Sequence, residues 1–229
     1  ALKNNFIGTA NLARIAHFNM VKRFIFISTD KAVNPINIMG ASKRLAERFL
    51  QTQFKDSGTQ FVIARFGNVL GSRGSVVPLF LRQIRSGGPV TVTDRRVVRY
   101  FITIPEAVSL VLKAAEVGDN GDIYILDMGQ QINILKLAEN LIYLTGLKPY
   151  VDIPIQFIGL REGEKLSEEL ATESEGVYPS KYKGLYKADT DNNGKHDFVL
   201  LKNKIESFLA VEDIQSCYQL IQDVIPTLK

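Results

Sequence analysis

Four polar residues follow an unbroken apolar run near the start of the chain. Residues 24–27 read Phe-Ile-Phe-Ile, which is typical of a strand buried on both faces of a parallel sheet. Ser28, Thr29, Asp30 and Lys31 come directly after this run. Because ligands of open parallel sheets bind outside the carboxyl ends of the strands, these side chains are placed where a substrate would lie.

A helix is expected to bring another cation to the same strand end. An Asn-Pro dipeptide at residues 34–35 breaks the chain, and the spacing then predicts a helix from Met39 to about Gln53. Met39 and Lys43 are four residues apart and therefore share one face of this helix. We expect Lys43 to face the strand end.

A strand that ends in Ser-Thr, followed by a helix with Tyr-x-x-x-Lys, resembles the extended short-chain dehydrogenases/reductases. The fuller string Ser-Thr-Asp-Lys-Ala-Val-Asn-Pro at residues 28–35 resembles one branch of them. That branch is the UDP-N-acetylglucosamine 4,6-dehydratases of capsule and O-antigen polysaccharide biosynthesis, in their C-terminal portion. The resemblance implies NAD or NADP as cofactor, with Ser28 in its site and Lys43 on the nicotinamide ribose. This chain departs from the pattern at the tyrosine, because Met39 has no ionisable proton and the base must lie elsewhere.

The resemblance also implies the roles of the residues at the strand end. These enzymes oxidise C4 of a UDP-N-acetylhexosamine, remove water across C5 and C6, and return the hydride to C6. The 4-keto group acidifies the C5 proton, so a base can remove it while an acid protonates the departing hydroxyl. By resemblance Asp30 is that acid, Lys31 is the C5 base and Thr29 binds the C4 oxygen. Met39 and Lys43 complete the predicted catalytic set.

A glycine-rich segment follows the next predicted strand. Residues 65–78 contain three glycines and two serines, so the backbone can approach a ligand closely. On composition alone this could be an ordinary connecting loop. It resembles the nucleotide-sugar loop of the dehydratases, which places Asn68 against the substrate diphosphate or sugar and near the cofactor, with Ser75 in the substrate site.

A third string, at residues 159–166, resembles the family's Gly-Leu-Arg-Pro-Gly-Glu-Lys-Leu, with Glu162 in place of proline. An arginine beside a glycine turn suits a bidentate phosphate contact, and the resemblance gives Arg161 that role. The predicted substrate site also includes Arg99 and Glu164, although Glu164 could be structural. Without the family, a helix start with mixed surface charge explains this string. We expect residues 65–78 and 159–166 to approach one pocket near Ser28.

The alternation of strand and helix patterns predicts an α/β fold. It would be a parallel Rossmann-like sheet, with its N-terminal strands missing, and a smaller α/β substrate-binding lobe. Residues 1–68 and 99–130 would form the dinucleotide-binding part, and residues 69–98 and 131–229 the nucleotide-sugar lobe. Helices are expected at 4–17, 39–53, 80–86, 105–116, 132–145 and in the last thirty residues, and strands at 24–27, 61–66, 89–93 and 121–129.

Composition excludes several classes of protein. The 229 residues are 45% hydrophobic, without an apolar run long enough for a membrane span or a signal-peptide pattern. With one cysteine as well, we expect a cytoplasmic protein, whose full-length relatives can be membrane-anchored through an N-terminal part. The net charge of +4 comes from scattered basic residues, which favours an anionic small substrate over nucleic acid. No cluster has metal-ligand spacing: residues 189–200 match a calcium loop only superficially, since Leu200 replaces the final glutamate.

Two other functions stay open. A nucleotide-sugar epimerase would use the same fold and cofactor, but it needs no acid and base after Ser-Thr, so Asp30 and Lys31 argue against it. A catalytically silent nucleotide-sugar-binding or assembly fragment is favoured by Met39. It is also favoured by the absence of a glycine-rich dinucleotide turn from the sequence. The full-length enzyme is expected to be a homo-oligomer.

The missing turn leads to a prediction about cofactor binding. The 229-residue chain should bind NAD and NADP weakly or not at all, because the turn and helix N-terminus that hold the pyrophosphate are not in its sequence. Isothermal titration with each dinucleotide measures this. Micromolar binding to a monomer of these residues would show that the turn is not required.

Overall fold

The computed structural model describes residues 1–72, 74–189 and 196–228. The chain divides into two compact units, of which the first comprises residues 1–66, 109–127 and 169–229 and the second residues 67–108 and 128–168. These units differ in extent from the predicted lobes. Residues 99–108 group with the second unit, and residues 169–229 group with the first.

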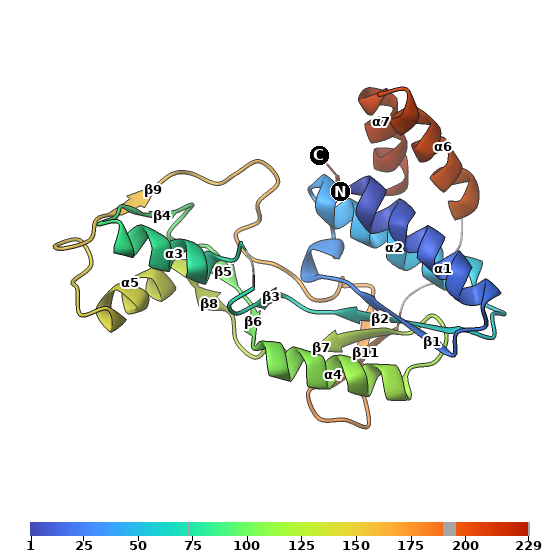
Figure 1. The fold of residues 1–229 in the computed structure, drawn as a ribbon, viewed down its shortest axis with the longest axis horizontal. Coiled ribbons are helices and arrows are strands. Elements are labelled where there is room, and N and C mark those ends of the chain that lie inside the picture. The colour runs from blue at the N-terminus through green and yellow to red at the C-terminus, as the bar shows by residue number, and fades with distance from the viewer. Residues whose placement is uncertain (73, 190–195, 229) are drawn as a thin grey trace. The chain divides into compact units, whose positions relative to one another are not determined.

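The first unit is built on a five-stranded sheet with the order β1-β2-β7-β11-β10 (Figure 1). Neighbouring strands β1, β2 and β7 run parallel, with Phe26 opposite Ile63 and Ile63 opposite Ile123. Strands β11 and β10 continue the sheet in antiparallel pairing. The strands are β1 (Arg23–Ile27), β2 (Gln60–Arg65), β7 (Ile123–Leu126), β10 (Gly176–Pro179) and β11 (Leu185–Asp189). The prediction of an α/β fold around parallel strands is confirmed.

The β10–β11 hairpin was not among the strands expected from the sequence, which placed this region in the substrate lobe. Leu185 lies opposite Leu126 of β7, and both Leu185 and Ala188 are buried. The other residues of β11 are partly or fully exposed, so its apolar pattern is too short to predict a strand. Of the superficial calcium-loop match at residues 189–200, residues 190–195 lie outside the described residues.

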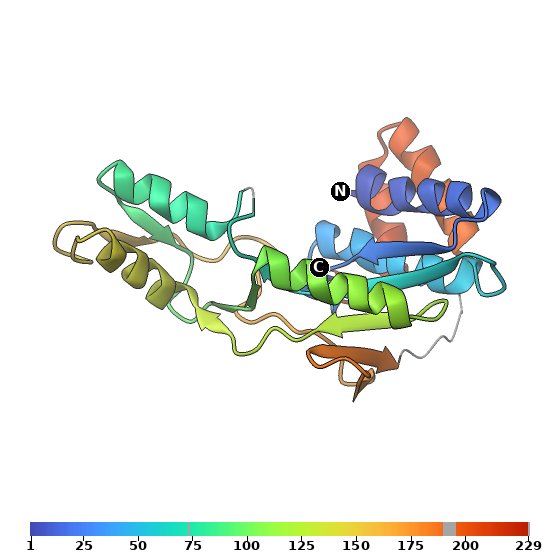
Figure 2. The ribbon, with the colours of Figure 1, turned by 60° about the horizontal axis from the view of Figure 1, so that its bottom comes forward.

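Helices cover both faces of this sheet (Figures 1 and 2). A short π-helix, η1 (Lys3–Gly8), leads into α1 (Thr9–Phe18), and these lie with α2 (Ile38–Gln53) over one face, while α4 (Ile104–Val117) covers the other. Residues 61–64 of β2 are fully buried because alternate side chains meet opposite helical layers. Parallel strands buried in this way produce the continuous apolar runs seen in the sequence.

Two helices at the C-terminal end join the core of the first unit. They are α6 (Phe198–Ala210) and α7 (Ile214–Val224), in the region where one or two helices were predicted. Ile205 and Ile221 are fully buried in the same cluster as Phe49 of α2, and the single cysteine, Cys217, is buried there too. Among the helices described, none combines the length and the apolar character needed to span a membrane.

In its described residues, the second unit has three pairs of short strands and the helices α3 and α5. Pairs β3–β6 and β4–β9 are parallel, and β5–β8 is antiparallel. Phe80 and Ile142, from the two helices, are buried in one core with Val90 and Ile153. The elements are β3 (Asn68–Val69), α3 (Val76–Arg85), β4 (Val90–Val92), β5 (Val98–Arg99), β6 (Phe101–Ile102), β8 (Ile132–Asn133), α5 (Ile134–Leu144) and β9 (Ile155–Phe157).

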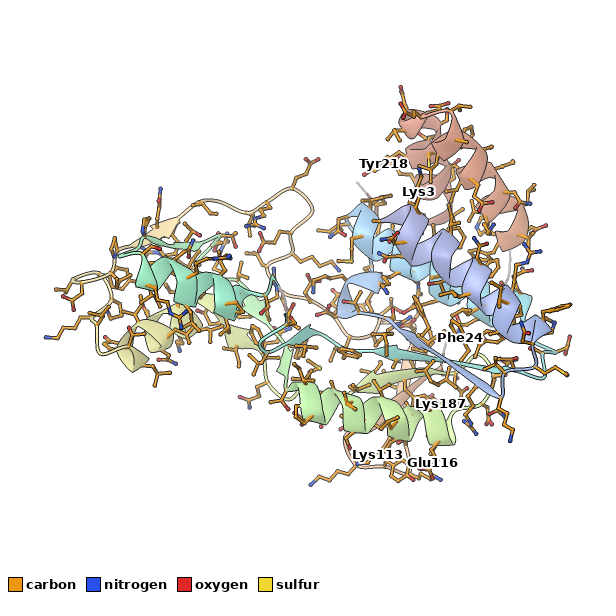
Figure 3. The ribbon with its side chains drawn as sticks, viewed as in Figure 1. Lys3, Phe24, Lys113, Glu116, Lys187 and Tyr218 are labelled. Atoms are coloured by element: carbon orange, nitrogen blue, oxygen red, sulfur yellow. The ribbon has the colours of Figure 1, made fainter. Side chains whose placement is uncertain are left out.

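Charged side chains around α4 and β11 pair with one another at the surface. Figure 3 shows Lys113 and Glu116 projecting from α4. Glu116 accepts a hydrogen bond from the Tyr182 hydroxyl at 2.8 Å, and Lys187 of β11 forms an ion pair with Asp122 at 2.8 Å. The ion pair of Lys187 with Asp122 therefore balances one of the positive charges of this surface.

The chain leaves β1 through a tight turn that packs against the start of α2. Residues 30–32 form a 3₁₀ helix, η2 (Asp30–Ala32), and Gly40 lies in the first turn of α2. A Cβ atom on Gly40 would lie 2.1 Å from the backbone oxygen of Lys31. Glycine is therefore required for the close approach of the helix to the turn.

This contact predicts the effect of adding one methyl group. Gly40→Ala should lower the free energy of unfolding by about 1–3 kcal/mol, because the backbone must move to relieve the overlap. Chemical denaturation followed by circular dichroism measures the loss. Gly58→Ala is the matched control, since a Cβ atom there meets no atom within 4 Å. Equal stabilities of the two variants would contradict the close approach.

Candidate functional site

The residues after β1 form a hydrogen-bonded group around Asp30. Thr29 is the N-cap of η2, and its Oγ1 donates to Asp30 Oδ1 at 2.8 Å. Lys31 Nζ forms an ion pair with the same oxygen at 2.8 Å. The backbone N–H of Asp30 donates to the oxygen of Phe66, just beyond β2, at 3.1 Å. The three residues predicted from the sequence to act together are thus in contact.

The second oxygen of Asp30 is the unusual feature of this group. Asp30 is 0% exposed, and its Oδ2 has no hydrogen-bond partner among the described residues. A buried carboxylate oxygen left without a partner is costly, so such atoms generally bind water or a ligand, or serve in catalysis. A substrate hydroxyl could supply the missing partner.

Lys43 reaches the same strand end from α2. Its Nζ donates to the backbone oxygen of Ile27 at 2.9 Å and lies 4.6 Å from the centre of the Phe26 ring. Burial lowers the pKa of Lys43, and the negative charge of Glu47 only partly offsets this effect. One hydrogen bond leaves two of the three ammonium donors for a ligand. Met39 is half-buried one turn earlier, and its backbone oxygen accepts a hydrogen bond from Ser42 Oγ at 2.7 Å.

Ser28 points away from the Asp30 group and into a buried cluster of four charges. Its side chain is buried, and its Oγ donates to Glu47 Oε1 of α2 at 2.6 Å. Arg65 of β2 binds Glu47 through Nε at 2.8 Å and Nη2 at 2.7 Å, and binds Glu175 through Nη1 at 2.8 Å. Arg44 donates to both carboxylates at 3.1 Å. We call Arg44, Glu47, Arg65 and Glu175 the charge cluster.

The charges in this cluster stabilise one another. Burial raises the pKa of Glu175, but hydrogen bonds and charge from Arg65 and then Arg44 outweigh it and lower the pKa from 4.5 to about 2. Burial also raises the pKa of Glu47, but the charge and hydrogen bonds of Arg65, the charge of Arg44 and the hydrogen bond from Ser28 together outweigh it and lower the pKa. The same carboxylates outweigh the burial of Arg65 and raise the pKa of its guanidinium. Glu47, Arg65 and Glu175 are therefore held in their charged forms.

Sequence reasoning missed this cluster as a unit, although two signals were present. Arg65 is a charged residue at the end of an otherwise apolar strand, and Glu47 lies one helical turn beyond Lys43 on the same face. Arg65 was interpreted only as the start of the glycine-rich loop. Glu175 lies 110 residues from Arg65, so no local pattern could connect them.

The other predicted ligands lie in the second unit. Asn68 Nδ2 donates to the backbone oxygen of Tyr100 at 3.0 Å, which joins the start of β3 to the residue before β6. Ser75 precedes α3, and its Oγ is buried without a hydrogen-bond partner in the described part of the chain. Their substrate contacts, and that of Asn68 with the cofactor, stay predictions.

Arg99 and Glu164 contact each other. Arg99 Nη2 donates to Glu164 Oε1 at 3.1 Å and to the oxygen of Lys165 at 2.8 Å, while Nη1 donates to the oxygens of Val98 and Leu166. Glu164 also accepts from the backbone N–H of Arg161 at 3.2 Å. This geometry favours a structural contribution from both residues, as was left open for Glu164. The Arg161 side chain is exposed and makes no ion pair with the described residues, so its donors suit a phosphate.

The predicted site residues thus fall into two groups. The first unit brings Thr29, Asp30, Lys31 and Lys43 to the end of β1, and the second unit holds Asn68, Ser75, Arg99, Arg161 and Glu164. The expectation that residues 65–78 and 159–166 approach one pocket near Ser28 joins both units and stays a prediction.

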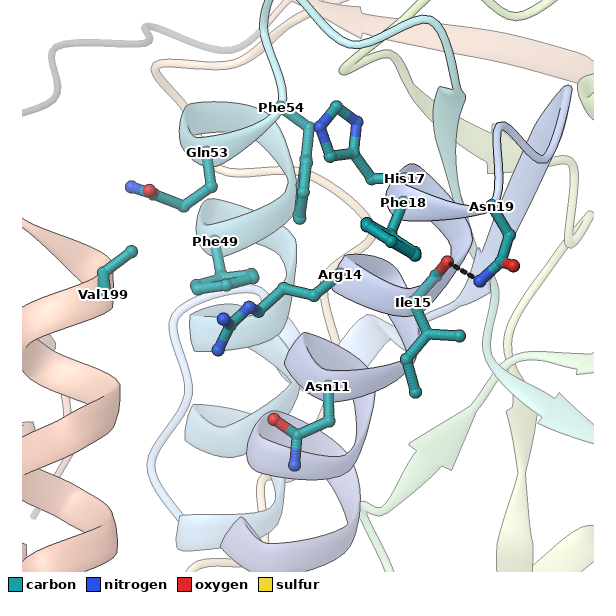
Figure 4. A pocket seen from close by; sticks show the side chains of 10 residues that line it. All are labelled: Asn11, Arg14, Ile15, His17, Phe18, Asn19, Phe49, Gln53, Phe54 and Val199. Atoms are coloured by element: carbon teal, nitrogen blue, oxygen red, sulfur yellow. Dashed lines mark hydrogen bonds between the residues drawn. The ribbon is translucent and has the colours of Figure 1, made fainter.

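The first unit has a surface groove elsewhere, between α1 and α2. Figure 4 shows Phe18, Phe49 and Phe54 along it, with Val199 of α6 at one side. None of the predicted site residues lines it. The described residues also contain no group of three or more His, Cys, Asp or Glu side chains that could hold a metal ion.

The chain is similar to known proteins in both sequence and fold. Residues 1–190 match the family described as polysaccharide biosynthesis protein. The capsular polysaccharide biosynthesis protein CapD of Staphylococcus aureus is 51% identical over 203 residues, which cover 88% of this chain and 34% of CapD. A UDP-glucose 4-epimerase of Rickettsia rickettsii is 37% identical over 195 residues, which cover 83% of this chain and 55% of the epimerase. The chain therefore spans about a third of the first relative and about half of the second.

Solved structures share the fold. Pen from Bacillus thuringiensis matches with a TM-score of 0.76 and 34% identity, over 86% of this chain and 61% of Pen. Solved dehydratases and epimerases with bound NAD match at TM-scores of 0.63 to 0.65 and 18 to 22% identity. At that identity the likeness concerns the fold alone, and it confirms the predicted Rossmann-like α/β class.

The lowered pKa of Glu175 predicts how stability depends on pH. Its contribution should be complete above pH 4.5 and should disappear as the pH falls to about 2, because the unfolded chain then binds the proton more readily. The loss is roughly 3 kcal/mol, at about 1.4 kcal/mol per pKa unit. Denaturant unfolding at a series of pH values measures it.

A pair of variants isolates this carboxylate. Glu175→Gln should be less stable at neutral pH and should show a shallower loss between pH 4.5 and about 2. Glu173→Gln, at an exposed neighbouring position, should follow the unsubstituted chain. Parallel curves for all three proteins would show that the charge of Glu175 does not support the fold.

Proposed function

The chain belongs to the polysaccharide biosynthesis protein family, and we propose that it contributes the acid–base site of a nucleotide-sugar 4,6-dehydratase. The proposed substrate is UDP-N-acetylglucosamine, and the product is a UDP-4-keto-6-deoxy sugar for capsule or O-antigen polysaccharide. The similarity to CapD supports the polysaccharide assignment. The observation that carries the dehydratase assignment is the Asp30–Lys31 pair beside Thr29 at the end of a parallel strand.

This pair could provide an acid and a base from one shared proton. Lys31 Nζ and Asp30 Oδ1 are 2.8 Å apart, close enough for direct transfer of a proton from the ammonium to the carboxylate. The transfer leaves a neutral amine, able to remove the C5 proton, beside a carboxylic acid, able to protonate the departing C6 hydroxyl. The amine then carries the C5 proton as an ammonium, water leaves, and the pair returns to its starting charges.

The residues at the strand end also fit a nicotinamide dinucleotide. Bound NAD or NADP would accept the hydride from C4 and return it to C6. Lys43 presents an ammonium with two remaining donors at the carboxyl end of β1, which suits the hydroxyls of a ribose. Thr29, next to Asp30, would hydrogen-bond the C4 oxygen. The wider substrate site would take the diphosphate through Arg161, with Asn68 and Ser75 on the sugar side.

Met39 requires that another group accept the C4 hydroxyl proton. A thioether cannot act as a base, so the proton must pass to a nearby ionisable side chain. Asp30 is the candidate, because its partnerless Oδ2 could accept a hydrogen bond from the C4 and C6 oxygens in turn, directly or through a water held by Thr29. The C4 proton would then pass from Asp30 to water, so that the carboxylate is free to accept the proton of Lys31 before elimination.

A nucleotide-sugar epimerase is the second candidate, supported by the 37% identity to the Rickettsia rickettsii UDP-glucose 4-epimerase. Epimerisation needs oxidation and reduction at C4 but no removal of the C6 hydroxyl. The reaction products separate the two: a dehydratase forms a 4-keto-6-deoxy sugar, whereas an epimerase forms only the C4 epimer. Proton NMR of the nucleotide sugar distinguishes them directly.

Substitutions in the full-length protein test the assignment of roles. Asp30→Asn should lower kcat about 100- to 10,000-fold, because it removes the group proposed to move protons at two oxygens. Met39→Leu should keep most of the turnover, because leucine preserves the apolar volume and the thioether takes no part. Conversion of UDP-N-acetylglucosamine followed by NMR measures both.

The opposite pattern would contradict the proposed roles. If Met39→Leu abolished turnover while Asp30→Asn retained it, the base would not be Asp30. If Asp30→Asn preserved C4 inversion in a protein that forms no 4-keto product, the protein would be an epimerase. Circular dichroism checks that each variant is folded.

A further inference from the structure

We propose that Ser28 is a positioning residue, which fixes Thr29 and Asp30 by attaching the end of β1 to the buried charge cluster. The inference rests on the proposed function for its effect on turnover. It assigns Ser28 a role different from the cofactor contact that the family resemblance implies. The charge cluster then serves the site through one hydroxyl group.

The contacts of Ser28 run in two directions. Its Oγ donates to Glu47 Oε1 at 2.6 Å, and its backbone N–H donates to the oxygen of Ala64 in β2 at 2.7 Å. The side chain is therefore held by α2 and the backbone by the neighbouring strand. Ser28 is 4% exposed, so little of it can contact a ligand in solvent.

Glu47 is a rigid acceptor for this hydroxyl. Its carboxylate also receives both Nε and Nη2 of Arg65, and Nη1 of Arg44. A hydrogen bond from a hydroxyl to a carboxylate is about twice as strong as one between neutral groups, and a 2.6 Å separation is typical of it. Because Glu47 cannot move without separating buried charges, Ser28 is fixed to a stationary point.

Ser28 influences Thr29 and Asp30 through the backbone, because Thr29 is bonded directly to it. Thr29 Oγ1 donates to Asp30 Oδ1 at 2.8 Å. On the far side of Thr29, the Asp30 N–H donates to the oxygen of Phe66. Thr29 is thus held in place from both sides, by the hydrogen bonds of Ser28 and by the backbone hydrogen bond of Asp30. A displacement of about 1 Å at a reacting group can reduce the rate about 100-fold.

Ser28→Ala tests this role without disturbing the charges. All four members of the charge cluster keep their partners in this variant, whereas Glu47→Gln would leave two buried arginines facing one carboxylate. Thr59→Val is the matched control, because Thr59 is equally buried, precedes β2, and loses a hydroxyl that donates to the oxygen of Ala16 at 3.4 Å. Neither variant changes the net charge.

Two measurements are made on each variant. Hydrogen–deuterium exchange of the peptide covering residues 28–33 reports the mobility of the strand end and needs no activity. We expect exchange there to rise at least about tenfold in Ser28→Ala, with the midpoint of thermal unfolding changed by a few degrees at most, and to stay unchanged in Thr59→Val. Turnover of UDP-N-acetylglucosamine by the full-length protein should fall about 10- to 100-fold in kcat, with KM for NAD unchanged.

The two readouts separate the failure of this inference from that of the proposed function. Unchanged exchange in Ser28→Ala would overturn the inference whatever the activity. A raised KM for NAD with unchanged exchange would instead make Ser28 a cofactor ligand. Faster exchange with undiminished kcat would show that the attachment does not position the reacting groups. Faster exchange in a protein without dehydratase activity would support the attachment and reject the proposed function alone.

Discussion

The burial of Arg65 is the constraint around which the first unit is arranged. The Arg65 side chain is 0% exposed, so its guanidinium, at the end of β2, is not in contact with solvent water. A buried cation without partners costs several kcal/mol, so Glu47 of α2 and Glu175, just before β10, must both reach it. These contacts set the position of α2 on the sheet and bring a distant part of the chain to the same point. Removing one partner alone would cost about 3–5 kcal/mol.

A buried charge cluster of this kind fixes the relative positions of the elements it joins more than it increases the net stability of the fold. Attraction between buried ions is largely offset by the water they lose, and well-packed apolar residues can be equally stable. Directional hydrogen bonds, however, accept one geometry, and Arg65 uses both Nη atoms and Nε in forks that fix two carboxylates. The end of β1 and the start of the proposed active site are therefore attached to this cluster through the Ser28 hydroxyl.

The local parts of this arrangement could be predicted from the sequence, and the long-range parts could not. Apolar runs that stop at Ser28 and Arg65 predicted two parallel strands, and the Asn-Pro break at residues 34–35 predicted that a helix begins near Met39. These signals depend on residues close together in the chain. The contact of Lys43 with Ile27 agrees with the face on which it was expected. The β10–β11 hairpin and Glu175 were missed, since only β7 and Arg65, far away in sequence, explain their burial.

The direction of the Ser28 side chain also could not be predicted from the sequence. In a buried strand, successive side chains point to opposite faces of the sheet. The strand pattern alone does not show which of these faces is covered by a helix that could bind the side chain. A polar residue at a strand end could bind a ligand or a buried partner equally well. The position of Glu47 decides it, and although Glu47 shares a helix face with Lys43, the sequence does not show that it contacts Ser28.

The contact between Gly40 and the carbonyl of Lys31 has a consequence for the speed of proton transfer. With the backbone of the η2 turn pressed against α2, Lys31 can change the position of its amino group only by rotating its own side chain. Rotations of exposed side chains take picoseconds to nanoseconds, and the Lys31 side chain is 22% exposed, whereas loop movements take up to microseconds and closing domains up to milliseconds. Enzymes of ordinary speed turn over about 1 to 1,000 times per second. The proposed acid–base pair, Asp30 and Lys31, could therefore rearrange many thousands of times within one catalytic turnover. Slower movements of the protein, rather than this rearrangement, would limit the rate.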